Sequence, residues 1–518
     1  MLENSQRANR LVKNIIVLYI RTFITLLIGL YTSRVILNSL GIVDFGLYNV
    51  IGGVVGFMSF INSSLAVSTI RFISYEQGNG STLERLHLTF STSRVVHWLL
   101  AFIILILAET VGLWYVNNHI VAPEGREIAV RILYQFTIVT CVLNIISVPY
   151  NALIVAHEKM SAFAYISIFE SVTKLFIAWI ICVIRFDRLI TYGLLMTLLY
   201  VASFGIYRIY CWKHFSETQG KVIYDKKQIK AMATFSLWIT NGTLAVAAYT
   251  QGLNLLLNSF FGPIVNAARG IAVQVQSAIF SFCSSFQSAA KPQITKSYAE
   301  GDFTYLHKLV FNVSNYSFYL MFFISLPIIA ETPFILKLWL GEVPEYTVPF
   351  VRLTLLVNML ESLKMPLNTS IHATGNIKKF QLLEGTVMLM ILPLSFMCLK
   401  FGMSATSVFV IQAIIFFIAQ LIRCYIVCPA IRMSRCLYMK NCLLKILIVI
   451  IPPSIIVLLL KSFIHIAIDW FSFVIIGIIS VVTTGLSIFY IGLDKSSRYK
   501  AIIKVSTYIS KYNNIARL

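Results

Sequence analysis

The stretch from Phe471 to Gly492 reads FSFVIIGIISVVTTGLSIFYIG and contains no charged side chain. The stretch from Phe401 to Ile422 is uncharged as well. An α-helix needs about 20 predominantly apolar residues to cross the hydrocarbon core of a bilayer, and each of these stretches is long enough. Both therefore predict membrane-spanning helices.

The composition of the whole chain supports the same conclusion. Hydrophobic residues make up 58% of the 518 and charged residues 12%, against roughly 45–50% and about 25% in soluble domains. Hydrophobic cores stop growing beyond about 250–300 residues, so a soluble fold could not bury this surface. We expect an all-α, polytopic membrane protein with about fourteen transmembrane helices. The spans are expected near residues 14–35, 45–67, 88–108, 132–154, 162–184, 190–210, 233–256, 264–286, 313–336, 350–371, 381–400, 402–423, 443–460 and 471–492.

The distribution of basic residues predicts the orientation of the chain. The chain carries a net charge of +21, and strongly basic chains are often nucleic-acid-binding proteins. However, 29 of the 42 Lys and Arg residues lie in alternate connections between the expected spans, and only 10 lie in the opposite connections. Cytoplasmic loops of membrane proteins carry such an excess of positive charge. We therefore expect both termini in the cytoplasm, and no nucleic acid as a partner.

The sequence lacks the common motifs of enzymatic and metal chemistry. It has no P-loop, no dinucleotide-binding fingerprint and no H-E-x-x-H. The only cluster among the nine cysteines is Cys424, Cys428, Cys436 and Cys442, whose spacing differs from that of zinc sites. We expect no enzymatic activity, no metal site and no bound cofactor.

An internal repeat predicts the domain organisation. Tyr75 to Gly78 follows the second expected span and Tyr298 to Gly301 follows the eighth, at an offset of 223 residues. Upstream, Leu40-Gly41 and Phe261-Gly262 match at an offset of 221. Six spans separate the two copies, so they share one orientation, as in transporters built from parallel repeats. The expected parts are an N-terminal lobe (1–212), a C-terminal lobe (213–425) and two extra helices with a basic tail (426–518).

Several of these segments resemble a known family. Leu40 to Tyr48 and Arg71 to Gly78 resemble the first helices of bacterial polysaccharide flippases, and Phe261 to Gly270 is similar to their eighth helix. The resemblance is strongest to the Wzx flippases of O-antigen and capsule synthesis. These belong to the multidrug/oligosaccharidyl-lipid/polysaccharide exporter (MOP) superfamily.

The resemblance carries expectations about structure and function. It implies two six-helix, MATE-like lobes around a central cavity, in a bacterial inner membrane. The implied substrate is an oligosaccharide on undecaprenyl pyrophosphate, moved from the cytoplasmic to the periplasmic leaflet. Membrane lipids and other polysaccharide-assembly membrane proteins are the further expected partners. Without an ATP-binding motif, proton or sodium coupling, or removal of the product, would drive the transport.

The pyrophosphate of such a substrate is negatively charged, so the protein should offer positively charged side chains within its membrane spans. A cation within a span costs about 2.5–3.5 kcal/mol on insertion scales, so it needs a reason to be there. Arg21 is the strongest candidate, since Asn14, Arg21, Thr25 and Thr32 form one polar stripe on the first span. We expect Arg21 and Thr25 to bind substrate. The alternative is a structural arginine bonded to the carbonyls of a neighbouring helix.

Arg269 is the counterpart in the second lobe. Arg269, Gln276 and Gln287 lie on one face of the eighth span, because seven and eighteen residues are nearly whole numbers of turns. A guanidinium suits bidentate contact with phosphate oxygens. Arg269 and Gln276 are therefore further candidates for substrate binding. The alternative for Arg269 is an arginine that extends to the lipid headgroups.

Two Lys–Glu pairs complete the set of candidate residues. Glu170 precedes Lys174 by four residues and Glu361 precedes Lys364 by three, so each pair could form within one helix. In the functional interpretation, the lysines bind substrate and the carboxylates couple transport to an ion. Pro366 should interrupt the tenth span, and broken polar helices often carry substrate or ion sites in transporters.

Two other functions remain as alternatives. A MATE-type drug/cation antiporter would need acidic residues to hold its substrates, whereas the candidate residues here are mainly basic. A membrane polysaccharide polymerase or ligase would carry a large periplasmic loop. The longest outside connection, about 109–131, is too short for one.

Overall fold

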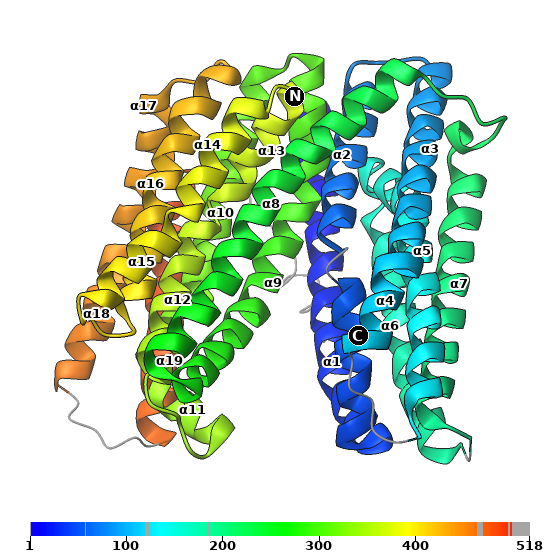
Figure 1. The fold of residues 1–518 in the computed structure, drawn as a ribbon. Coiled ribbons are helices and arrows are strands. Elements are labelled where there is room, and N and C mark those ends of the chain that lie inside the picture. Colours follow the sequence, from blue (N-terminus) through cyan, green and yellow to red (C-terminus); the bar gives the residue numbers. More distant parts are fainter. Residues whose placement is uncertain are drawn as a thin grey trace, which may run out of the picture. The chain divides into compact units, whose positions relative to one another are not determined.

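The computed structural model describes residues 2–56, 59–119, 125–184, 186–463, 470–495 and 498–499. Within these ranges every regular element is a helix, which confirms the all-α fold (Figure 1). The first half contains α1 (Leu2–Gly56), α2 (Ser59–Gly78), α3 (Leu83–Leu107), α4 (Leu113–His119), α5 (Glu127–Ala156), α6 (Met160–Val183), α7 (Arg188–His214) and α8 (Lys226–Phe261).

The second half contains α9 (Pro263–Glu300), α10 (Phe303–Ala330), α11 (Thr332–Leu340), α12 (Thr347–Glu361), α13 (Lys364–Thr374), α14 (Lys378–Leu389), α15 (Ile391–Lys400), α16 (Ser407–Ala430), α17 (Arg435–Tyr438), α18 (Lys445–Phe463) and α19 (Trp470–Ser487). Short 3-10 or π segments are Ala108–Gly112, Ser216–Thr218, Met439–Leu444 and Ile488–Gly492.

Eleven helical segments among the described residues are long and apolar enough to cross a membrane. They include Arg435–Ser462 and Trp470–Gly492, which correspond to the last two expected spans. The expected spans near 45–67, 264–286 and 350–371 are mostly helical in their described residues but are not among the eleven. The last of these is divided into α12 and α13, which have only 15 and 11 residues. The multi-pass membrane architecture is thus confirmed.

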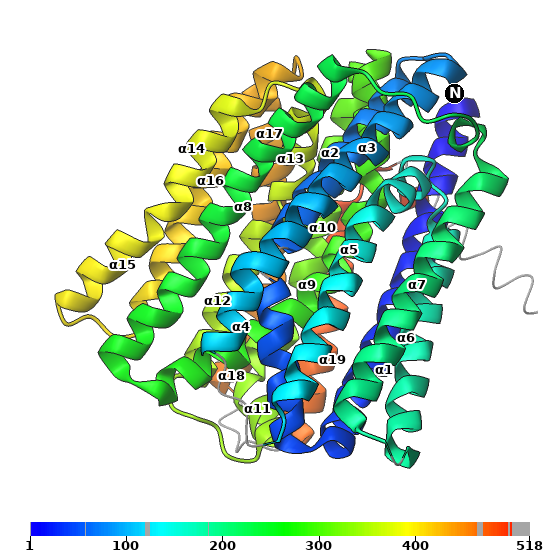
Figure 2. The same ribbon diagram turned by 45° about the vertical axis from the view of Figure 1, so that its right-hand side comes forward.

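The chain forms two compact units. Unit 1 consists of Met1–Val246, Ser288–Leu306 and Thr369–Gly385, and unit 2 of Ala247–Gln287, His307–Asn368 and Thr386–Leu518. Within unit 1, α1 packs along α6 and α5 packs along α7; Figure 2 shows α1, α6 and α7 side by side. The lobes expected from the repeat, 1–212 and 213–425, stay a prediction.

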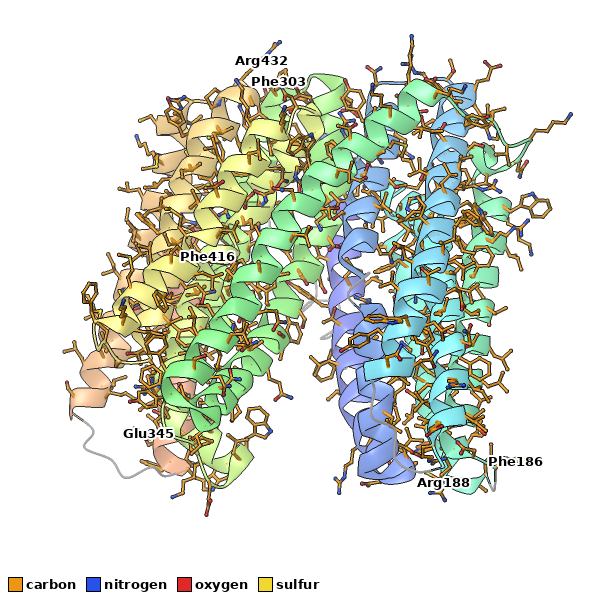
Figure 3. All side chains as sticks on the ribbon, viewed as in Figure 1. Phe186, Arg188, Phe303, Glu345, Phe416 and Arg432 are labelled. Atoms are coloured by element: carbon orange, nitrogen blue, oxygen red, sulfur yellow. The ribbon has the colours of Figure 1, made fainter. Side chains whose placement is uncertain are left out.

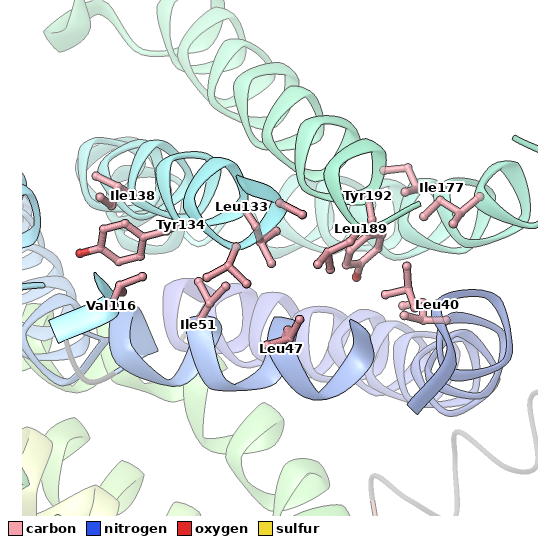
Figure 4. Close-up of a cluster of buried hydrophobic side chains, with 14 of the residues drawn as sticks. Leu40, Leu47, Ile51, Val116, Leu133, Tyr134, Ile138, Ile177, Leu189 and Tyr192 are labelled. Carbon is pink, nitrogen blue, oxygen red and sulfur yellow. The ribbon is translucent and has the colours of Figure 1, made fainter. Parts of the chain in front are cut away.

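A cluster of buried apolar side chains packs the helices of unit 1 together (Figure 4). Membrane helices gain little from the hydrophobic effect between themselves, so close packing is the main stabilising contribution here. The hydroxyl of Tyr134 in this cluster donates a hydrogen bond to the Ala108 carbonyl at 2.7 Å. The labelled members come from α1 (Leu40, Leu47, Ile51), α4 (Val116), α5 (Leu133, Tyr134, Ile138), α6 (Ile177) and α7 (Leu189, Tyr192).

The repeat seen in the sequence extends to the backbone. Gly41 has φ 77° and interrupts α1, while its counterpart Gly262 has φ 78° between α8 and α9. Glycine adopts a positive φ at no steric cost, whereas other residues rarely adopt it. The matched glycines therefore make the same kind of break between the first two helices of each repeat.

In each unit, residues from connections that the charge pattern places on opposite sides of the membrane lie at opposite ends of the helices (Figure 3). In unit 1, Phe303 lies at one end and Phe186 and Arg188 lie at the other (Figure 3). In unit 2, Arg432 and Glu345 likewise lie at opposite ends (Figure 3). Phe303 and Arg432 belong to connections expected on the cytoplasmic side, and the other three residues to connections expected outside.

Candidate functional site

A polar pocket of about 350 Å³ lies among the helices of unit 1. Four helices supply its polar lining: Asn62 and Ser63 from α2, Asn144, Ser147 and Asn151 from α5, Glu170 from α6, and Tyr200, Ser203 and Tyr207 from α7. The Asn62 Oδ1 atom is buried and accepts no hydrogen bond from any described residue. Since lipid cannot hydrogen-bond such groups, the pocket is a place for water or a polar ligand.

Of the residues that line this pocket, only Glu170 is among those predicted from the sequence, although the sequence contains a signal for the others. The polar residues of α5 are spaced by three and four residues, and so are those of α7. This spacing puts each set on one face of its helix. Two polar stripes in apolar helices would have predicted a shared cavity.

Arg21 lies beside this pocket. Its guanidinium carbon is 4.9 Å from the centre of the Phe163 ring on α6, a cation–π distance. Arg21 is close enough to Glu170 and Tyr207, both lining the pocket, to interact with them electrostatically. Its Nε atom is buried and has no hydrogen-bond partner among the described residues. Nε thus lacks the carbonyl bond that the structural alternative expects, and substrate binding by Arg21 stays a prediction.

Two other residues of the predicted stripe on α1 bond to backbone carbonyls. Asn14 is buried and its amide donates a hydrogen bond to the Glu158 carbonyl at 3.1 Å. The Thr25 hydroxyl donates to the Thr22 carbonyl of its own helix at 3.2 Å. A role of Thr25 in substrate binding stays a prediction.

Lys174 joins the same group of residues in unit 1. Its Nζ atom lies 5.5 Å from the centre of the Tyr200 ring. No direct ion pair between Lys174 and Glu170 is formed in the described part of the chain, although each lies within the other's electrostatic reach. One carboxylate thus lies near two cations, Arg21 and Lys174. The excess of positive charge makes this region suitable for an anionic group.

Arg269 belongs to unit 2, and its environment is different. It is only 5% exposed, and it donates hydrogen bonds to the Asn254 side chain and, at 3.0 Å, to the Thr250 carbonyl. Both partners belong to α8. The structure thus places Arg269 inside the protein rather than at the lipid headgroups.

Gln276 connects α9 to α12. Its amide donates to Asn358 Oδ1 at 2.8 Å, and the Asn358 amide donates back to the Gln276 carbonyl at 3.2 Å. Such reciprocal bonds fix the contact between two membrane helices. The expected contact of Gln276 with substrate stays a prediction.

The break between α12 and α13 has a local cause. Pro366 has no N–H, so it cannot donate the helical hydrogen bond to the carbonyl four residues earlier, that of Ser362. The Gln287 amide donates to this carbonyl instead, at 2.7 Å, and also to the Ser317 hydroxyl at 3.0 Å. The interruption expected at Pro366 is confirmed, and Gln287 satisfies the carbonyl that it leaves free.

We expect Gln287→Ala to destabilise the protein less in a Pro366→Ala background. In the native chain the substitution leaves the Ser362 carbonyl unpaired, which costs about 1–3 kcal/mol. Alanine at position 366 restores the N–H donor. The apparent midpoint of thermal unfolding of the four variants forms a double-mutant cycle. Equal losses in both backgrounds would contradict the pairing.

Glu361 and Lys364 flank this break. Glu361 is the last residue of α12, and Lys364 is the first of α13. The Glu361 carboxylate acts electrostatically on Tyr249 of α8, and so does Arg269. Arg269 and Glu361 therefore share a neighbourhood in unit 2.

One ion cluster was not expected from the sequence. Arg126 forms ion pairs with Asp44 of α1 and with Asp187, the residue before α7. Asp187 also accepts a hydrogen bond from the Ile190 amide at 3.0 Å, which caps the start of α7. Arg126 itself directly precedes α5. This cluster joins three helices at one end of unit 1.

Comparison with solved structures shows which fold this is. A MATE transporter crystallised in its bent conformation superimposes with a TM-score of 0.71 at 12% identity, over 82% of this chain and 96% of that one. A MOP superfamily transporter from Pyrococcus furiosus, described as having a binding pocket of reverse polarity, gives 0.67 at 13% identity, over 82% and 97%. At these identities the likeness concerns the fold. No curated protein sequence is significantly similar to this chain.

Comparison with family models identifies the family. The model described as "Polysaccharide biosynthesis protein" matches residues 11–298, which is more than half of the chain. This range contains the segments around Gly41, Arg71 and Gly262 on which the sequence resemblance rested. The chain therefore belongs to the polysaccharide biosynthesis protein family, and it has the fold of MOP superfamily transporters.

Proposed function

We propose that the protein flips undecaprenyl-pyrophosphate-linked oligosaccharide, an O-antigen or capsule repeat unit, from the cytoplasmic to the periplasmic leaflet. The observation that carries this proposal is Arg21, a cation on a membrane helix whose Nε has no hydrogen-bond partner among the described residues. It lies beside a pocket with a polar lining from four helices. Family membership supplies the polysaccharide context.

The charges of the candidate residues favour an anionic substrate. Unit 1 contributes Arg21 and Lys174 against one carboxylate, Glu170. The pyrophosphate would bind Arg21 by charge and by the planar geometry of the guanidinium. Arg269 and Lys364 are the proposed substrate-binding cations of unit 2. A drug/cation antiporter has the same fold, but it would need the opposite balance of charge.

The two intramembrane carboxylates are the proposed points of ion coupling. Glu170 lies in the polar pocket near Arg21 and Lys174, so its charge state would alter the field that a bound anion meets. Glu361, at the broken helix of unit 2, is the second candidate. Proton or sodium binding would thereby be linked to substrate affinity.

We also propose a location in a bacterial inner membrane with both termini in the cytoplasm. The charge pattern supports this orientation, since the connections at one set of ends carry most of the basic residues. The ends of each unit agree with the expected alternation of connections (Figure 3).

Deleting the gene tests the function in the cell. We expect surface polysaccharide to be lost and lipid-linked oligosaccharide to accumulate, because synthesis continues while export stops. Both should be measured, together with sensitivity to cationic drugs. Unchanged surface polysaccharide with increased drug sensitivity would support the antiporter instead.

A further inference from the structure

A second cavity, of about 540 Å³, lies in unit 1 between α2, the beginning of α8 and the connection from α13 to α14. Its lining includes four cations, Arg71, Lys227, Lys230 and Lys378, and no Asp or Glu. The lysines are exposed, while Arg71 is half-buried. None of these four residues is among the substrate-binding residues predicted from the sequence.

Arg71 is held rigidly at this cavity. Its Nε donates to the His372 carbonyl at 3.2 Å and its Nη2 to the Ala373 carbonyl at 3.1 Å, near the end of α13. Its guanidinium carbon also lies 4.6 Å from the Phe72 ring and 5.5 Å from the Phe235 ring. Nη1 makes no hydrogen bond to the described part of the chain. The Arg71 guanidinium is therefore fixed in the wall of the cavity, with Nη1 available to donate a hydrogen bond to a ligand.

Lysines and the N-terminus of a helix also line the cavity. Lys378 is the first residue of α14, and its Nζ lies 5.4 Å from the Trp238 ring. The first backbone N–H groups of a helix have no acceptor within the helix, and they attract anions. Gly375, with φ 81°, turns the chain so that α14 starts at the cavity. Ammonium groups, a guanidinium and these N–H groups thus surround one space.

Two acids lie close in sequence to these cations, and neither lines the cavity. Asp225 precedes Lys227 by two residues, and its Oδ1 atom accepts a hydrogen bond from the Lys227 backbone N–H at 3.0 Å. Glu76 is within electrostatic reach of Arg71 and is engaged by other partners. The Glu76 carboxylate accepts a hydrogen bond from the Ser81 hydroxyl at 2.5 Å and pairs with Arg85 at 3.4 Å. A ligand with two or more negative charges on oxygen would match the cations that remain. A diphosphate has this charge, and its oxygens accept the bidentate contacts that guanidinium offers.

We propose that this cavity is a docking site for the diphosphate of a polyprenyl-linked substrate, distinct from the pocket beside Arg21. The inference rests on the proposed function for the identity of the molecule that carries the diphosphate. Lys227, Lys230 and Lys378 attract and hold the group, and Arg71 orients it. By the charge pattern this end of unit 1 is the cytoplasmic one, where the substrate is made available.

Binding to the purified full-length protein tests the proposal. The affinity for undecaprenyl diphosphate in detergent is compared between the native protein and the triple variant Lys227→Gln, Lys230→Gln, Lys378→Gln. We expect affinity to fall about tenfold or more, since even one charge-assisted contact is worth about that factor. The matched control is Lys159→Gln, Lys213→Gln, Lys221→Gln. It removes the same charge from exposed lysines outside the cavity and should bind as the native protein does.

Two further ligands identify the source of the phosphate. Inorganic pyrophosphate should displace the lipid from the native protein, whereas phosphatidylglycerol should not. Competition by phosphatidylglycerol at equal strength would show a general anionic-lipid surface and overturn the proposal. Equal loss of affinity in both triple variants would also overturn it, since only overall charge would then matter. Thermal unfolding of both variants checks that they are folded.

Transport measured on the same proteins separates this inference from the proposed function. If the native protein binds diphosphate through the three lysines but moves no lipid-linked sugar, the proposed function fails and the docking site stands. If the native protein transports and the cavity triple variant binds normally, the docking site fails and the proposed function stands.

Discussion

Replacing Arg21 by alanine should lower transport of lipid-linked oligosaccharide about ten- to a hundredfold, since a charge-assisted hydrogen bond to phosphate is worth about 1.5–3 kcal/mol. The Nε atom of Arg21 has no protein hydrogen bond among the described residues, so its removal breaks no bond there. Protein abundance should therefore stay near normal. Surface glycan and accumulated intermediate, measured together, report the effect.

Two other arginine variants make this result interpretable. Arg34 lies on the same helix and is exposed, so Arg34→Ala removes an equal charge away from the pocket and should leave transport near normal. Arg21→Lys keeps the charge but loses the planar, bidentate geometry. Full transport by Arg21→Lys would show that charge alone matters. Normal surface glycan in Arg21→Ala would remove Arg21 from the substrate path.

Among the substitutions proposed for this protein, Arg126→Met should lower the free energy of unfolding most. The substitution leaves Asp44, whose side chain is only 7% exposed, without its cation. Removing one member of a buried ion pair costs about 3–5 kcal/mol, and we expect the lower figure because Arg126 itself is partly exposed. The apparent midpoint of thermal unfolding should fall by about 5 °C or more.

A second substitution should reverse most of this loss. Asp44→Asn in the Arg126→Met background removes the unpaired charge, so the double variant should be more stable than Arg126→Met alone. Arg131→Met is the matched control, because Arg131 lies near the start of α5, which Arg126 directly precedes, and is exposed. A double variant no more stable than Arg126→Met would show that the ion pair with Asp44 is not what stabilises the three helices.

Features that depend on local sequence were predictable. The membrane-spanning helices follow from long apolar stretches, and the break before Pro366 follows from the missing N–H of proline. The repeat matches Gly41 with Gly262, and both have a positive φ, which glycine adopts at no steric cost. Arg21 was predictable as a candidate for substrate binding, because a charged side chain in an apolar membrane helix costs insertion free energy.

Features that depend on how helices meet were harder to predict. Arg126, Asp44 and Asp187 are far apart in sequence and meet because the starts of α5 and α7 lie next to the part of α1 that follows Gly41. The partners of Gln276 and Gln287 depend on the packing of α9 against other helices of unit 2. For such contacts a helix face can be predicted from periodicity, but the helix that covers it cannot.

The proposed movement of a lipid-linked oligosaccharide across a bilayer can be measured directly. The most direct test is to reconstitute the purified protein in vesicles that carry the lipid-linked glycan in one leaflet only. A membrane-impermeant glycosidase added outside then measures how much glycan becomes accessible. We predict that native protein exposes the glycan much faster than protein-free vesicles do, and that Arg21→Ala slows this about ten- to a hundredfold. Exposure at the protein-free rate by correctly folded native protein would contradict the account.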